Sequence, residues 1–156
     1  MIRFEVPGTG TLTIENILFD YNGTLAVDGI PVAGVREKIN THAGKVNFHV
    51  ITADTFGTVN KALSETACRV VTIPVEDQAK AKAAYLERLG PSVTLACGNG
   101  ANDELTLKNA ALGVAVMLEE GVNTRALMAS DLVIRDILDL FAYLEKPGRV
   151  TACLRT

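Results

Sequence analysis

The feature that most constrains the fold is the stretch Ile17–Leu25, which reads Ile-Leu-Phe-Asp-Tyr-Asn-Gly-Thr-Leu. Its apolar start predicts a strand that is covered on both faces, as in parallel sheets. Asp20 then lies at the carboxyl end of that strand, where open α/β sheets bind their ligands. Asn22 and Gly23 tolerate positive φ and predict a tight turn, although the same pair is also a strong hairpin signal. A carboxylate held at this place is suited to act as a nucleophile or as a metal ligand.

Length and composition limit the classes of protein to which the chain can belong. With 156 residues, of which 48% are hydrophobic and 21% charged, residues 1–156 are expected to form one domain with a proper core. The net charge of −3, without a basic run, argues against a nucleic-acid partner. No apolar stretch approaches the roughly 18 residues of a membrane span, and the three cysteines show no disulfide or zinc pattern. We therefore expect a cytoplasmic protein without a membrane partner.

Strand and helix patterns alternate along the chain. Strands are expected at 2–6, 11–15, 16–20, 46–52, 69–73, 93–97, 112–116 and 131–134, the first two as an N-terminal hairpin. Helices are expected at 33–43, 56–66, 76–89, 103–109, 121–129 and 136–144, with an extended flap at 24–31. Short connections with right-handed crossovers imply a parallel sheet with helices on both faces. The predicted fold is a doubly wound, Rossmann-like α/β domain.

Polar residues follow the strand ends of this scheme. Asp20 comes after the first core strand, Thr52 ends the second, and the glycine-rich loop Gly98–Asp103 follows the fourth. The set resembles the haloacid dehalogenase (HAD) superfamily, which includes phosphatases and P-type ATPases. Its first motif, Asp-x-Asp/Thr-Gly-Thr-Leu, is matched from Asp20 onward, and its last, Gly-Asp-Gly-x-Asn-Asp, is matched with one change. Sequence segments such as Thr-Ala-Asp-Thr-Phe-Gly resemble those of the small soluble P-type-ATPase-like HAD proteins most closely.

The resemblance implies a phosphohydrolase that uses an aspartyl-phosphate. Asp20 would attack the phosphoryl group, while Thr52 and a lysine would hold the phosphoryl oxygens. We expect this lysine to be Lys82 rather than Lys80, because the residues that follow Lys82 match the family motif Lys-Ala-Glu-x-Val-x-x-Leu more closely. A phosphorylated substrate is the expected partner.

The resemblance also implies a Mg²⁺ site, because Mg²⁺ prefers hard oxygen ligands. Asp20, the backbone carbonyl of Asn22, and Asp103 would supply them. Asn99 stands where the family has a metal-binding Asp, so its amide oxygen remains available but one negative charge is lost. We expect weaker metal binding as a result.

A second departure from the family pattern affects proton transfer. HAD phosphatases carry an Asp two residues after the nucleophile, which protonates the leaving group and then activates water. Asn22 stands at that position, and its amide cannot transfer a proton. P-type ATPases carry Thr there. We expect slow turnover that favours leaving groups needing no proton.

The spacing of the motifs leaves no room for a cap domain, since one crossover fills each interval between Asp20, Thr52 and Lys82. An open site accepts a bulky or macromolecular phosphate, or it is covered by a neighbouring subunit. Apolar residues around Leu118 and Val122 suit either a homo-oligomer or ordinary core packing.

An alternative is a degenerate HAD fold that binds phosphate or a partner with little turnover. Asn22 and Asn99 favour this alternative. The retention of the nucleophile, the threonine, the lysine and the last aspartate favours the enzyme.

Other polar residues near the motifs have ordinary structural explanations. Asn102 is expected to cap the helix that follows it, and in the family it also steadies the loop. Asp54 and Thr55 are expected to cap the helix at 56–66. His42 and His49 lie outside the motifs and are expected to be structural.

Overall fold

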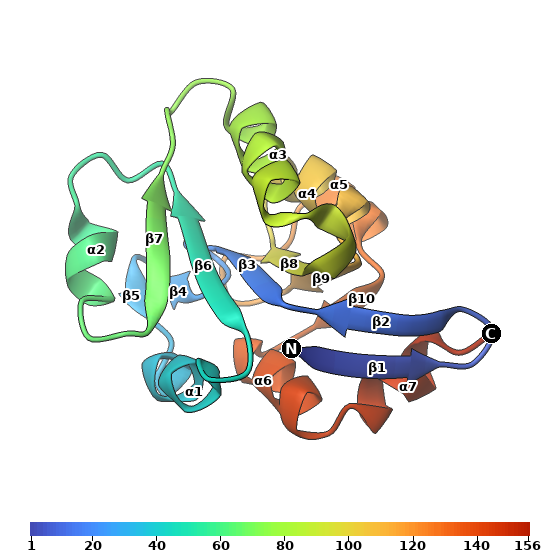
Figure 1. Cartoon of the computed structure of the whole chain (residues 1–156). Helices are drawn as coiled ribbons and strands as arrows, with labels where there is room; N and C mark the ends of the chain where they lie inside the picture. Colours follow the sequence, from blue (N-terminus) through green and yellow to red (C-terminus); the bar gives the residue numbers. More distant parts are fainter.

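The computed structural model describes residues 1–156 and has a central parallel sheet between two layers of helices (Figure 1). Six strands pair in the order β10–β9–β8–β3–β6–β7, and every neighbouring pair is parallel. They are β3 (Asn16–Asp20), β6 (Asn47–Thr52), β7 (Cys68–Thr72), β8 (Thr94–Gly98), β9 (Leu112–Val116) and β10 (Leu132–Ile134). The chain runs outward from β3 to β7 and then returns to β8 on the other side of β3. The predicted doubly wound sheet is therefore confirmed, with its switch point between β3 and β8.

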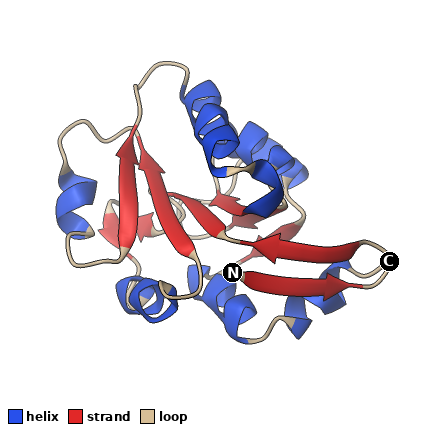
Figure 2. Ribbon diagram, viewed as in Figure 1, coloured by secondary structure: helices blue, strands red, loops and turns tan.

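Helices cover both faces of this sheet (Figure 2). One face is covered by α1 (Val35–His42), α2 (Thr58–Ala62) and α6 (Ile137–Glu145), and the other by α3 (Gln78–Leu89), α4 (Glu104–Asn109) and α5 (Thr124–Ala129). Along β3, Ile17 and Phe19 belong to the larger core cluster, whereas Leu18 packs with Tyr85 and Leu86 of α3. Both faces of β3 are thus buried, which explains its continuous apolar sequence.

The predicted N-terminal hairpin is present as β1 (Ile2–Val6) and β2 (Gly10–Ile14), and it leads directly into β3. A helix that the sequence did not predict, α7 (Gly148–Leu154), packs against β1 (Figure 1). The hydroxyl of Thr151 donates a 2.8 Å hydrogen bond to the carbonyl of Glu5, and Phe4 and Val150 are fully buried in the same core cluster. Tertiary packing supports this helix, because its Gly, Val, Thr and Cys are weak helix formers.

The other connections are short. The flap is a two-stranded hairpin, β4 (Ala26–Val27) and β5 (Ile30–Pro31), and single turns of 3₁₀-helix occur at η1 (Pro91–Val93) and η2 (Ala101–Asp103). The helix predicted at 56–66 is shorter than expected at both ends: α2 (Thr58–Ala62) begins after Gly57, which lies at φ 75°, and Leu63 leaves the helical conformation at φ −109°. The helix predicted at 121–129 begins at Thr124, where the side chain of Asn123 caps it.

No cap domain is inserted at either interval between the motif residues, as the spacing predicted. That the whole chain forms one domain remains a prediction. None of the helices has the length and apolar character needed to cross a membrane.

Candidate active site

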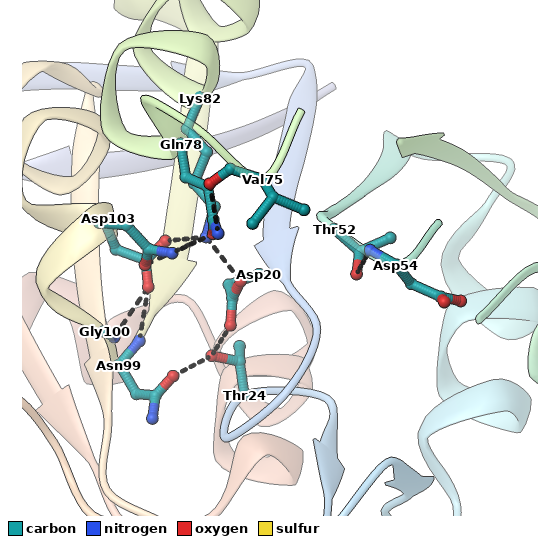
Figure 3. Close-up of polar contacts among 11 residues, drawn as sticks. Asp20, Thr24, Thr52, Asp54, Val75, Gln78, Lys82, Asn99, Gly100 and Asp103 are labelled. Carbon is teal, nitrogen blue, oxygen red and sulfur yellow. Dashed lines mark hydrogen bonds and ion pairs between the residues drawn. The ribbon is translucent and has the colours of Figure 1, made fainter. Parts of the chain in front are cut away.

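Three charged side chains, two of them buried and one partly exposed, meet at the carboxyl ends of β3 and β8 (Figure 3). We call Asp20, Lys82 and Asp103 the charged trio. Lys82 Nζ lies 2.6 Å from Asp20 Oδ1 and 2.7 Å from Asp103 Oδ1. The side chain of Lys82 is 1% exposed and that of Asp103 4%, whereas that of Asp20 is 14% exposed. Asp20 is therefore the member of the trio that a ligand can reach.

The glycine-rich loop after β8 fixes Asp103 in this position. Asp103 Oδ2 accepts hydrogen bonds from the backbone N–H groups of Asn99 (3.1 Å) and Gly100 (2.8 Å). A Cβ atom at Gly98 would collide with the carboxyl group of Asp103. Glycine at position 98 thus provides the space that lets the carboxylate fold back onto its own loop.

The turn after β3 brings Asn99 against the same site. Gly23 lies at φ 77°, and a Cβ atom there would collide with the side-chain amide of Asn99. Thr24 Oγ1 lies 3.4 Å from both Asp20 Oδ2 and Asn99 Oδ1, so one hydroxyl is within hydrogen-bonding distance of both oxygens. Thr24 is a site residue to which sequence reasoning gave no role, although it belongs to the matched motif.

The donor set around Thr24 fits a hard cation. Asp20 Oδ2, Asn99 Oδ1 and the carbonyl of Asn22 are oxygens of the kind that Mg²⁺ takes. Both oxygens of Asp103 are already engaged, one by Lys82 and the other by backbone N–H groups. No group of three or more His, Cys, Asp or Glu side chains is gathered to hold a metal. An ion here would therefore depend on amide, carbonyl and water oxygens in addition to the carboxylates of Asp20 and Asp103.

Burial and charge set the protonation of the trio. The pKa of Asp20 is raised from 3.8 to about 6, first because burial disfavours its carboxylate and then because Asp103 repels it, while Lys82 acts in the opposite direction. Burial alone would lower the pKa of Lys82, but the two neighbouring carboxylates outweigh it and raise that pKa. Lys82 is therefore an ammonium ion at neutral pH.

The raised pKa of Asp20 predicts a pH-dependent stability of the metal-free protein. Because the folded state holds this proton more tightly than the unfolded state, the stabilisation is complete below about pH 4 and is lost as the pH rises through about 6. We expect Asp20→Asn to remove this loss and to increase the free energy of unfolding at pH 7 by at most about 3 kcal/mol. Denaturant unfolding in EDTA at pH 4 and pH 7 measures the difference. A variant that is less stable than wild type at pH 7 contradicts the prediction.

Removing the lysine of the trio is expected to destabilise the protein. Lys82→Met leaves two buried carboxylates facing each other without their cation, so we expect a loss of about 3–5 kcal/mol in the free energy of unfolding. Lys80→Met is the matched control, because Lys80 lies on the same helix but is 78% exposed and pairs with the similarly exposed Asp77 at 3.7 Å. Its stability should change by less than about 1 kcal/mol. Equal effects of the two substitutions in denaturant unfolding would show that the buried pairing contributes nothing.

A cleft of about 610 Å³ opens beside Asp20. Thr52 lines it from the end of β6, across from Asp20 (Figure 3). Thr52 Oγ accepts a 3.2 Å hydrogen bond from the N–H of Asp54, so its proton is free to be donated to an anion. Asn22 also lines the cleft, is exposed, and makes no side-chain hydrogen bond. Thr52 and Asn22 thus face the cleft with Asp20, whereas Lys82 and Asp103 lie behind it.

Three polar residues near the site, Asn102, Asp54 and Thr55, are expected from the sequence to cap helices. Asn102 is not a helix cap: its Nδ2 donates to Gln78 Oε1 at 2.7 Å, and its Oδ1 accepts from Lys82 at 3.4 Å. It ties the glycine-rich loop to α3 instead. The N-cap position of α2 is held by Gly57, and Asp54 supports the first turn from outside by accepting from the N–H of Val59, while it also accepts from the N–H of Phe56. Thr55 makes no capping bond.

No family model matches the chain. One curated relative, an uncharacterized protein of Methanocaldococcus jannaschii, is 44% identical over 61 residues. Those residues are 39% of this chain and 66% of the relative, so the match spans slightly less than two thirds of that protein.

Solved structures resemble the whole chain more fully. A HAD superfamily hydrolase of subfamily III A from Legionella pneumophila has a TM-score of 0.68 and 15% identity, covering 90% of this chain and 87% of its own. The 3-deoxy-D-manno-octulosonate 8-phosphate phosphatase of Moraxella catarrhalis, in complex with magnesium, phosphate and KDO, has a TM-score of 0.67 and 16% identity, covering 89% and 90%. A zinc-transporting PIB-type ATPase has a TM-score of 0.59 and 23% identity, covering 78% of this chain and 20% of the ATPase.

These likenesses concern the fold, since every identity lies below a quarter. They agree with the strand order, the parallel pairing and the absence of a cap. The chain has the HAD-like fold.

Proposed function

We propose that the protein is a Mg²⁺-dependent phosphohydrolase that works through an aspartyl-phosphate on Asp20. The observation that supports this proposal is the carboxylate of Asp20 at the strand end, partly open to a cleft and 2.6 Å from a buried ammonium group. Asp20 Oδ attacks the phosphorus, a P–O bond to the enzyme forms, and the bond to the leaving group breaks. Water then attacks the phosphorus, which releases inorganic phosphate and restores the carboxylate.

The surrounding residues would bind and orient the phosphoryl group. Lys82 holds Asp20 in place and supplies positive charge, and the Thr52 hydroxyl donates a hydrogen bond from the other side of the cleft. Mg²⁺ would be held by Asp20, the carbonyl of Asn22, Asn99 and Asp103, and when bound it would offset the charge of the phosphoryl oxygens. Asp103 Oδ2 accepts two hydrogen bonds, whereas Oδ1 accepts one, from Lys82, and keeps a lone pair that could contact the ion.

Proton transfer is the weak part of this site. Asn22 occupies the entrance to the cleft but has no proton to give or take. The leaving group must therefore depart without help, and the attacking water must lose its proton to solvent. Both limits support slow turnover that favours acidic leaving groups.

The rim of the cleft bears on the substrate class. Phe56 is 91% exposed and Val75 58% exposed, and both line the cleft without a cap above them. An apolar group beside the phosphate would cover them. The M. catarrhalis phosphatase acts on a small phosphorylated sugar acid by its name, whereas this open cleft also admits a bulky or macromolecular phosphate.

Hydrolysis of p-nitrophenyl phosphate with Mg²⁺ or with EDTA tests the proposal, because this leaving group needs little protonation. We expect metal-dependent release of p-nitrophenol that Asp20→Ala lacks. Intact-mass measurement after acid quench should also show one phosphoryl group on wild type. Background rates in every sample, together with unmodified protein, would reject the hydrolase.

The alternative is a phosphate-binding module with little turnover. It is favoured by the neutral side chains of Asn22 and Asn99 and by the engagement of Lys82 with two carboxylates. In that case phosphate with Mg²⁺ should still raise the melting temperature of the inactive protein, and Asp20→Ala should reduce that shift.

A further inference from the structure

We propose that a second cleft, at the opposite end of the sheet from Asp20, binds an oxyanion such as a carboxylate or a phosphate group. The cleft has a volume of about 580 Å³ and lies where β6 and β7 begin and α3 ends. Its polar lining consists of Asn16, Asn47, His49, Arg69 and Arg88, and no Asp or Glu lines it. This inference does not depend on the phosphohydrolase.

The charge of the cleft sets it apart from the rest of the molecule. The chain carries a net charge of −3, yet this cleft has two arginines and no acid. Neither Arg69 nor Arg88 forms an ion pair; every salt bridge of the protein lies elsewhere. Guanidinium groups match the geometry of carboxylate and phosphate oxygens, and they bind them through paired hydrogen bonds.

The two arginines are linked through a chain of contacts. The guanidinium carbon of Arg88 lies 4.9 Å from the ring centre of Tyr85, a cation–π contact. Tyr85 Oη lies 2.8 Å from His49 Nδ1, and His49 is only 9% exposed. His49 is in turn the strand neighbour of Arg69 across β6 and β7. The contacts with Tyr85 restrict the side chains of Arg88 and His49 before a ligand arrives, which reduces the entropy cost of binding.

The two asparagines that line the cleft are held in place by hydrogen bonds. Asn47 Nδ2 donates to Asn16 Oδ1 at 3.1 Å, and Asn16 Nδ2 donates to the carbonyl of Leu89 at 3.1 Å.

Burial, and secondly the charge of Arg69, lower the pKa of His49, so its ring is neutral at pH 7. Its Nε2 has no partner within the protein. The positive charge of the cleft therefore comes from the two arginines, and a neutral imidazole nitrogen remains for a further hydrogen bond.

Amide NMR of the full chain in EDTA, titrated separately with sodium phosphate and sodium succinate, tests the proposal. We expect saturable shifts at residues 47–49, 67–69 and 85–89. Phosphate bound near Asp20 would instead shift residues 20–24 and 98–103, so the two sites are distinguished in one spectrum. Saturation by phosphate alone, by succinate alone or by both supports the site and identifies the class of oxyanion. No saturable shift at the second cleft with either anion overturns it.

Substitutions decide whether the arginines bind the anion. Arg69→Ala and Arg88→Ala should each weaken binding about tenfold or more, and Arg88→Lys should recover only part of the loss because it lacks the planar fork. Arg149→Ala is the control, since Arg149 is an exposed helix arginine outside the cleft. Unchanged amide spectra away from the cleft verify folding. Affinity that is equal in wild type and in both cleft variants rejects the proposal.

Discussion

Replacing Asp20 by Asn is expected to abolish Mg²⁺-dependent phosphatase activity, with a loss of at least about 10³-fold in kcat/KM. Asn has nearly the shape of Asp and still offers an oxygen to Lys82 Nζ, which lies 2.6 Å from Asp20 in wild type. It lacks the negative charge and the nucleophilic carboxylate, so no aspartyl-phosphate forms. The rate is measured with p-nitrophenyl phosphate and saturating Mg²⁺.

The control for this substitution is Asp54→Asn, in the same cleft. Asp54 accepts hydrogen bonds from the N–H groups of Phe56 and Val59 and from the Thr58 hydroxyl, and Asn keeps only one of the two acceptor oxygens, so this control loses local hydrogen bonds as well as a charge. Its activity should stay within about threefold of wild type, since no reacting group is changed. The metal-free stability of Asp20→Asn is expected to rise at pH 7, so loss of activity with gain of stability excludes unfolding as the cause. Asp20→Asn with wild-type kcat/KM would show that Asp20 is not the nucleophile.

The doubly wound parallel sheet was predictable because local sequence determines the alternation of strands and helices. The run Ile17–Phe19 is apolar on both faces of a strand, and each later strand is followed by a helix pattern. Because the strands are parallel, their carboxyl ends lie at one edge of the sheet, and the observed pairing of β3 with β8 places the loops after these two strands side by side. The close approach of Asp20 to the Gly98–Asp103 loop follows from this topology.

The sequence pattern and the structure both place Lys82, rather than Lys80, beside Asp20, and helix geometry explains why. Residues two apart on a helix point to different sides. Lys82 therefore lies 1% exposed in the trio while Lys80 lies 78% exposed near Asp77. The residues that follow Lys82 match the family motif and predicted this lysine. The packing of α3 on the sheet explains why Lys80 cannot take its place beside Asp20.

The sequence did not predict features that depend on distant contacts. Asn102 has the appearance of a helix cap, yet it bonds to Gln78 on α3, a partner that local rules do not identify. The second cleft combines His49 of β6, Arg69 of β7 and Arg88 of α3, which no motif connects. Strand register and the end of a packed helix place them together, and neither can be read from spacing alone.

Replacing Asn22 by Asp is expected to raise kcat/KM for alkyl phosphates by about 10²–10⁴-fold, the usual contribution of general acid catalysis. Asn22 is exposed, lines the cleft and makes no side-chain hydrogen bond, so a carboxyl group fits there without a packing cost. An alkoxide leaves poorly without a proton, whereas p-nitrophenolate does not need one. The gain in kcat/KM should therefore be large for glycerol phosphate and small for p-nitrophenyl phosphate.

The turnover number separates the two steps of the reaction. If Asp at position 22 also activates the water that cleaves the aspartyl-phosphate, kcat rises for both substrates and less phosphorylated protein accumulates. Asn22→Ser is the control, because serine is small and polar but is no acid at neutral pH. It should leave the difference between the two substrates unchanged. An Asn22→Asp variant that hydrolyses glycerol phosphate no faster than wild type would mean that proton transfer at position 22 does not limit the rate.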